Sequence, residues 1–165
     1  ALAGDDTVRG LAGRDRLWGG QGDDMLNAGP GNDRFGGGTG RDRLFGGVGF
    51  DEMTGSFGDD HLVGGDDSDR LNLNRGDDFA RGGLSNDSFW AGRGRDVMWG
   101  GPGPDYFYPK RGKDRILAGK GPDYIFLKPD SVPDVVQCGS GVDKVLRAQS
   151  NDVLVDCEVV KKSSS

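Results

Sequence analysis

Residues 19–27, Gly-Gly-Gln-Gly-Asp-Asp-Met-Leu-Asn, are one copy of a nine-residue unit that recurs along almost the whole chain. Its general form is Gly-Gly-x-Gly-x-Asp-x-U-x, in which U is apolar. The Asp recurs every nine residues as Asp6, Asp15, Asp24, Asp33, Asp42, Asp51, Asp60, Asp69, Asp78, Asp87, Asp96, Asp105, Asp114 and Asp123. After a two-residue slip within residues 128–131 it resumes at Asp134, Asp143 and Asp152, which gives about 17 repeats. A short period maintained over this length is typical of solenoid proteins.

An apolar residue stands two places after every Asp of the series. Because strand residues alternate between two faces, the last three residues of each unit are expected to form a minimal strand with U pointing inward. The first six residues are expected to form a turn, since their glycines supply positive φ angles. One apolar side chain per unit makes a core only if units stack. We therefore predict an all-β parallel solenoid in which two nine-residue units form one coil.

The composition argues against a conventional core. Only 33% of the residues are hydrophobic and 32 of the 165 are Gly, which is typical of disorder unless something else holds the chain together. The formal net charge is −6, and only two of the 27 acidic residues, Glu52 and Glu158, are Glu. Short Asp carboxylates suit tight turns and metal coordination. The composition thus indicates that bound cations contribute to the fold.

Coils of two units place the Asp residues in two columns, one on each edge of the solenoid. Asp6 and Asp24 begin the first column, and Asp15 and Asp33 begin the second. Carboxylates stacked at the strand spacing of about 4.8 Å repel one another unless a cation lies between them. Oxygen ligands of flexible geometry favour Ca²⁺ over Mg²⁺ or Zn²⁺. The alternative is that each Asp only caps its own turn.

The repeat resembles the RTX, or hemolysin-type calcium-binding, nonapeptide family over residues 4–154. The resemblance implies a right-handed parallel β-roll with many calcium ions. In that family one turn supplies the carbonyls of its second and fourth residues and its Asp, and the next turn on the same edge supplies the carbonyls of its first and third residues and its Asp. Here a typical ion would lie between Gly20, Gly22 and Asp24 on one turn and Gly37, Thr39 and Asp42 on the next. The same pattern implies up to about a dozen ions.

Several turns depart from the pattern. Asp67 and Ser85 replace a turn glycine, and residues 109–114 bring three cationic side chains into one turn. A bound cation in that turn would meet repulsion from those side chains. We expect firm sites from Asp15 to Asp60 and weaker sites from Asp105 onward.

Cys138 and Cys157 are separated in the sequence by one coil plus one residue. This spacing places them on the same edge of adjacent coils, near the Cα separation that a disulfide needs. We predict a disulfide that closes an irregular C-terminal segment, residues 128–160, after a regular solenoid over residues 1–127. Two free buried thiols are the alternative. Residues 161–165 are expected to be a disordered tail.

Side chains that flank each inward residue are expected to point away from the core. On one sheet they form an aromatic ladder of Trp90, Tyr106, Tyr108, Tyr124 and Phe126. Two interpretations stay open. Either the rings stabilise an exposed sheet by cross-strand stacking, or they form an interface for another copy of the chain, another extracellular protein or a polysaccharide.

These features indicate a binding and structural protein, with no catalytic residues assigned. Adjacent carboxylates such as Asp59 and Asp60 do not flank a substrate at the separation that glycoside hydrolysis requires. The acidic balance disfavours nucleic acid as a partner, and no apolar run approaches the roughly 18 residues of a membrane span. We expect an extracellular or cell-surface location, where calcium is plentiful and a disulfide persists.

Two functions remain open from the sequence. The first is a secreted calcium-binding scaffold that folds on calcium and self-assembles into a filament or surface matrix. Assembly would use open solenoid ends or the aromatic face, because no N-terminal cap is recognised. The second is the calcium-folding C-terminal module of a larger type I-secreted enzyme, adhesin or toxin, as in many proteins of the family. The sequence favours the first.

Overall fold

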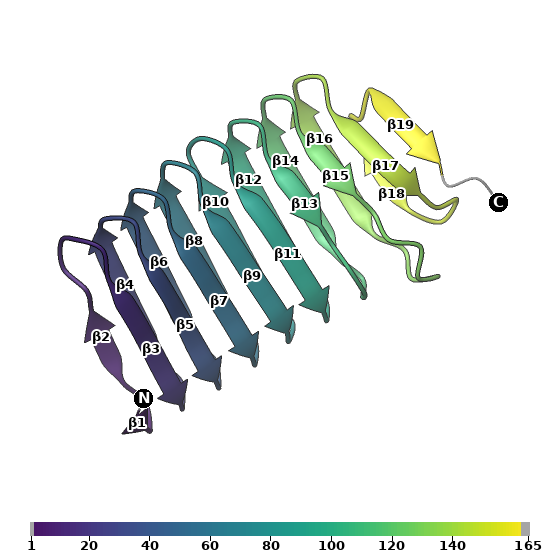
Figure 1. Ribbon diagram of the computed structural model, residues 1–165. Helices are drawn as coiled ribbons and strands as arrows, with labels where there is room; N and C mark the ends of the chain where they lie inside the picture. Colours follow the sequence, from purple (N-terminus) through teal and green to yellow (C-terminus); the bar gives the residue numbers. More distant parts are fainter. Residues whose placement is uncertain (1, 163–165) are drawn as a thin grey trace.

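The chain folds into a parallel β-solenoid, as the period predicted. The structure, a computed structural model, describes residues 2–162, with side-chain surroundings for residues 3–158. Within that range all regular structure is β-strand, and the strands lie side by side along one axis (Figure 1). No helix of the described part is long and apolar enough to cross a membrane.

Two sheets face each other across the core. The odd sheet contains β1 (Leu2–Ala3), β3 (Arg16–Gln21), β5 (Arg34–Thr39), β7 (Glu52–Phe57), β9 (Arg70–Arg75), β11 (Ser88–Arg93), β13 (Tyr106–Tyr108), β15 (Tyr124–Phe126), β17 (Lys144–Ala148) and β19 (Val159–Lys162). The even sheet contains β2 (Thr7–Arg9), β4 (Met25–Pro30), β6 (Arg43–Val48), β8 (His61–Asp66), β10 (Phe79–Gly83), β12 (Val97–Pro102), β14 (Arg115–Lys120), β16 (Val135–Ser140) and β18 (Val153–Val155). Consecutive strands therefore alternate between the sheets.

Neighbouring strands pair in parallel at an offset of one coil. Leu17 pairs with Phe35, and Phe35 with Met53, each two nine-residue units further along the chain. Across the slip the offset grows by two, as in the pairing of Ile116 with Val136, and it returns to 18 where Val136 pairs with Leu154. The extra residues lie in the connection between β15 and β16, so the slip leaves the ladder of hydrogen bonds intact.

Most strands are six residues long, twice the length that we predicted. β3, for example, continues through Gly19 and Gly20 to Gln21, where Gly20 pairs with Gly38 and Gln21 with Thr39. Only the next three residues, 22–24, lie between β3 and β4. Interpreting the Gly-Gly-x segment as a turn was wrong, because identical glycines one coil apart can pair even at positive φ.

The core has two inward positions per strand, and the sequence predicted one of them. The predicted apolar positions are buried from Leu26 to Val145, while Val8, Leu17 and Leu154 are partly buried near the ends. A second inward column lies two residues further along each strand and contains Ala28, Leu73, Ala91, Ala118, Leu127 and Cys138. In about half of the units this position is Gly, where a side chain would meet the carboxylate of the following turn Asp.

Close contact between coils explains the glycine at the fifth position of the strand. Gly38 has a φ of 122°, and a side chain there would overlap the carbonyl oxygen of Gly20 on the preceding coil. Ser56 and Asn74 occupy the equivalent place at φ values of 92° and 74°. Asn tolerates positive φ better than most residues, so this substitution is among the least strained.

The C-terminal segment contains the predicted disulfide. Cys138 on β16 and Cys157 after β18 are bonded, with Cα atoms 5.2 Å apart. β19 pairs with β17 and includes Lys161 and Lys162, which we expected in the tail. Backbone pairing to Leu146 and Ala148 extends the strand to those residues. The rest of the predicted tail, residues 163–165, lies outside the described residues.

Candidate metal sites

The repeated Asp residues are buried although each is a carboxylate. Every one from Asp24 to Asp143 in the series is between 0 and 3% exposed. Each stands at the end of a short turn, immediately before a strand begins. The two columns therefore run along the two edges of the solenoid, as the coil of two units predicted.

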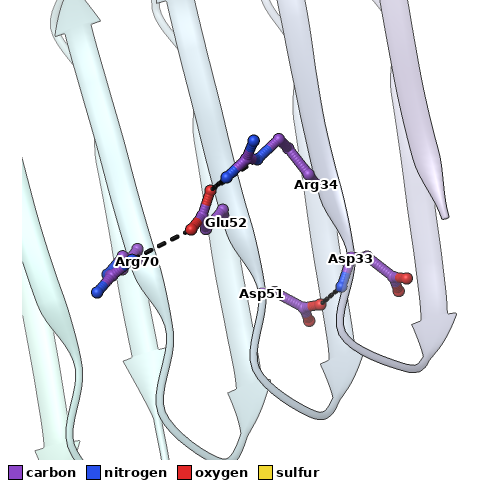
Figure 2. A network of polar contacts seen from close by, with 5 residues as sticks. All are labelled: Asp33, Arg34, Asp51, Glu52 and Arg70. Atoms are coloured by element: carbon purple, nitrogen blue, oxygen red, sulfur yellow. Dashed lines mark hydrogen bonds and ion pairs between the residues drawn. The ribbon is translucent and has the colours of Figure 1, made fainter. Parts of the chain in front are cut away.

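One oxygen of each carboxylate is fixed by the preceding coil. The backbone N–H of Asp33 donates to Oδ1 of Asp51 at 2.9 Å (Figure 2). The same hydrogen bond recurs in 15 turns with donor–acceptor distances of 2.7–3.1 Å. This contact orients the whole column, so Oδ2 takes a similar position in every coil.

The other oxygen is buried and has no hydrogen-bond partner among the described residues. This holds for Oδ2 of Asp15, Asp24, Asp33, Asp42, Asp51, Asp60, Asp69, Asp78, Asp87, Asp96, Asp105, Asp123 and Asp143. Buried polar atoms are nearly always paired in native proteins, and unpaired charged ones are costly. An array of unpaired carboxylate oxygens in register fits bound cations.

Carbonyl oxygens converge on the same positions. A side chain at Gly19 would overlap both Oδ2 of Asp24 and the carbonyl oxygen of Gly37 on the next coil. Gly46 stands in the same relation to Asp51 and to the carbonyl of Gly64. Carboxylate and carbonyl oxygens together are the donor set that calcium uses in proteins. The residues present therefore fit such an ion.

The other predicted ligands of the typical site lie at the same interface between coils. The carbonyl oxygens of Gly20 and Gly22 are directed at Gly38 and Gly40 of the next coil. The carbonyl of Thr39 accepts a hydrogen bond from the N–H of Gly22 at 2.8 Å. The structure thus brings Asp24 and Gly37 together directly, and Gly20, Gly22 and Thr39 line the adjoining coil contacts.

Burial changes the acid–base behaviour of the columns. Removal from water raises the pKa of Asp69, Asp78 and Asp105 to about 8. The backbone N–H from the preceding coil opposes this pKa shift, and repulsion from neighbouring Asp residues adds to it. A cation between the carboxylates would supply the opposite charge, which no ion pair among the described side chains provides to these columns.

Without a divalent cation, the fold is expected to lose stability as the pH rises from about 4 to about 8. An unfolded Asp titrates near its ordinary pKa of 3.8, whereas the pKa of Asp69 in the fold is about 8. Between these values the folded state binds more protons, so the free energy of unfolding falls with increasing pH. Below both values the carboxyls are neutral in both states and the stabilisation is complete. Thermal melts in EDTA should show a transition at pH 5 and either a lower Tm or no folded state at pH 8; a higher Tm at pH 8 would contradict the expectation.

A second set of Asp side chains lies outside the first and points the other way along the axis. Oδ1 of Asp5 accepts a hydrogen bond from the N–H of Asp23, and Oδ1 of Asp59 from that of Asp77. These outer residues are exposed. In the pair Asp59 and Asp60, the carboxylate of Asp59 therefore binds the following coil and that of Asp60 binds the preceding coil.

Some predicted ligands depart from the common arrangement. Asp6 is half-buried on the first coil, and neither Asp6 nor Asp114 is among the residues with an unpaired buried Oδ2. Asp114 belongs to the turn with Lys110, Arg111 and Lys113, all of them exposed. Asp105 and Asp123 were expected to form weaker sites. Like Asp24, each accepts an N–H at Oδ1 and has a buried Oδ2 without a partner among the described residues.

Sequence reasoning missed two kinds of residue here. Asp134 and Asp143 are buried like the earlier members of the columns, although the predicted ligand set stopped at Asp123. Glu158 was not considered because it falls outside the nine-residue register. The only signal for it was its rarity, since it is one of two Glu residues in the chain.

The other Glu residue lies on the outer face of the odd sheet, away from the turns. Glu52 forms ion pairs with Arg34 on one neighbouring strand and with Arg70 on the other, the latter at 3.1 Å (Figure 2). These groups are partly exposed, so the pairs contribute little to stability.

The aromatic ladder forms two stacked rows. Trp90, Tyr108 and Phe126 stack with ring centroids 5.5 and 4.8 Å apart, and Tyr106 stacks on Tyr124 at 5.0 Å. The planes are within 8° of parallel, so each ring covers the face of its neighbour. This arrangement favours stabilisation of the sheet over stacking against the rings of a sugar.

Comparison with known proteins agrees with the site geometry. The family model described as RTX calcium-binding nonapeptide repeat (4 copies) matches residues 1–35, 36–71 and 73–107. Together these residues make up more than half of the chain. The search of curated proteins found no match to the chain. The buried Asp columns continue beyond the matched residues, to Asp143.

Proposed function

The chain belongs to the RTX calcium-binding nonapeptide-repeat family, and on that premise we propose that it is a secreted scaffold whose solenoid forms when calcium occupies its turns. The observation that carries the proposal is the register of unpaired Asp Oδ2 atoms along both edges. Each bound ion would neutralise carboxylates on adjacent coils and so fasten one coil to the next. The role of the ions is structural, because their ligands hold adjacent coils of the solenoid together.

Several features support an extracellular location. Sites of this oxygen-only kind in extracellular modules have dissociation constants of about 10⁻⁴–10⁻³ M, which extracellular calcium can fill. The Cys138–Cys157 bond fits the same oxidising environment. Together they support secretion or display at the cell surface.

Self-assembly is the second part of the proposal. The outermost strands of the sheets, β1 and β2 at one end and β18 and β19 at the other, each pair on one side only within residues 2–162. Exposed strand edges pair readily with other chains. If this sequence is instead the module of a larger secreted protein, further coils would cover those edges. Electron microscopy in calcium distinguishes the two, since only the scaffold proposal expects filaments.

Calcium binding itself is tested by counting ions. We expect the chain to retain several calcium ions under native mass spectrometry, with a number approaching about a dozen at saturation. Magnesium at equal concentration should be retained poorly, because it demands a stricter octahedral geometry. A chain that retains no calcium while folded would overturn the proposal.

A further inference from the structure

The last coil breaks the rule that orients the other turns. In regular coils the N–H of each turn Asp donates to the Asp carboxylate one coil later. For Asp143 the residue one regular coil further on is Lys161. The N–H of Asp143 instead donates to Oε2 of Glu158 at 3.0 Å, over a sequence separation of 15. Glu158, which is exposed, thus accepts the hydrogen bond that a turn Asp accepts elsewhere, without belonging to the repeat.

Asp143 offers the same unsatisfied oxygen as the regular turns. It is 0% exposed, and its Oδ1 accepts the N–H of Asp123 at 2.9 Å. Its Oδ2 is buried and has no hydrogen-bond partner among the described residues. Half of a regular site is therefore present at the end of the solenoid.

The disulfide explains how a residue outside the register reaches this position. Glu158 directly follows Cys157, which is bonded to Cys138. Cys138 is fully buried on β16, five residues before Asp143. The bond therefore ties the residue beside Glu158 to the nine-residue unit, residues 138–146, that contains Asp143. The side chain of Glu, one methylene longer than that of Asp, extends the reach of its carboxylate.

We propose that Asp143 and Glu158 form one further cation site at the C-terminal end, and that the Cys138–Cys157 disulfide holds Glu158 in it. Oε2 of Glu158 accepts the N–H of Asp143, which leaves Oε1 for the ion, as Oδ1 and Oδ2 divide the two roles in regular turns. The site rests on the proposed function and takes the same ion, Ca²⁺. Its occupancy depends on the oxidation state of the cysteines.

The competing role for Glu158 is that of a simple cap. A cap needs only an oxygen that accepts the N–H of Asp143, whereas a cation site needs the negative charge. Glu158→Gln separates the two, because the amide oxygen of Gln still accepts the hydrogen bond but carries no charge. Glu52→Gln is the matched control, since it removes the same charge from the only other Glu, on an outer sheet face.

The experiment counts calcium ions on the full-length folded chain by native mass spectrometry at saturating calcium. Glu158→Gln is expected to retain one ion fewer than the wild-type chain, and Glu52→Gln the same number. Reduction of the folded wild-type chain with a phosphine, or the Cys138→Ser/Cys157→Ser variant, is expected to lose the same single ion. Circular dichroism in calcium shows whether each protein keeps its β-structure.

Each outcome decides a separate point. An unchanged ion count in Glu158→Gln would overturn the site and leave Glu158 as a cap. Loss of the ion in Glu158→Gln but not on reduction would overturn the part played by the disulfide. A wild-type chain that retains no calcium would overturn the proposed function, and this inference with it.

Discussion

Removal of calcium with EDTA at about pH 8 is expected to abolish most of the β-structure of the chain, and millimolar calcium is expected to restore it. Thirteen Asp side chains each have a buried oxygen without a hydrogen-bond partner among the described residues. At about 1–3 kcal/mol for each unsatisfied group, their sum equals or exceeds the roughly 5–15 kcal/mol that usually stabilises a domain. Because the sites do not exist in the unfolded chain, binding and folding are one process.

Far-ultraviolet circular dichroism measures this transition directly. A calcium titration should give one cooperative transition, and magnesium at the same concentration should restore much less of the signal. The disulfide persists in both states, so a residual structured end is compatible with the expectation. Superimposable spectra with and without EDTA would show that the solenoid stands without cations.

The effect of one central turn substitution on stability should depend on calcium, being destabilising in calcium and neutral or stabilising without it. Oδ1 of Asp60 accepts the N–H of Asp42 at 2.9 Å, and its Oδ2 is buried without a partner. Asp60→Asn keeps the hydrogen-bond acceptor but removes the charge. In calcium we expect it to destabilise the chain by about 3 kcal/mol, because a buried cation then lacks one partner. In EDTA it should instead be neutral or stabilising, because a buried charge is gone.

The neighbouring residue provides the control. Asp59 is exposed, and its Oδ1 accepts the N–H of Asp77 at 2.9 Å. Asp59→Asn keeps that hydrogen bond and changes the net charge by the same amount. We expect an effect within about 0.5 kcal/mol in either condition, as for other surface substitutions. Equal effects of the two variants in calcium would show that Asp60 does not bind a cation. Thermal melts in calcium at about pH 8, and in EDTA at about pH 5, where the calcium-free fold is expected to be more stable, measure all four values.

The period of nine residues was sufficient to predict the solenoid, its coil length and its two Asp columns. The strand length was not predictable from the same pattern. Gly19 and Gly20 have no side chains that alternate, so the periodicity of the strand disappears where it continues into the next unit. The second inward column was hidden for the same reason. Ala28, Leu73 and Cys138 reveal it only once the strand is known to extend that far.

The direction of each carboxylate also required the structure. Asp59 and Asp60 are adjacent and chemically identical, yet one is exposed and the other buried. The register identified Asp60 as the repeated residue, but nothing in the sequence shows that its Oδ1 binds the preceding coil. Glu158 was beyond prediction because its place depends on a disulfide and a shortened coil together.

The hydrogen bonds between the turns give the rod a chemical polarity. Each turn Asp of the buried columns receives an N–H from the coil before it, so within these columns loss of the first coil exposes a carboxylate oxygen, which water solvates readily. Loss of the last coil would instead leave a backbone N–H without its acceptor, the requirement that Glu158 meets for Asp143. The two ends of a buried Asp column are therefore chemically different, because one presents an acceptor oxygen and the other an N–H donor.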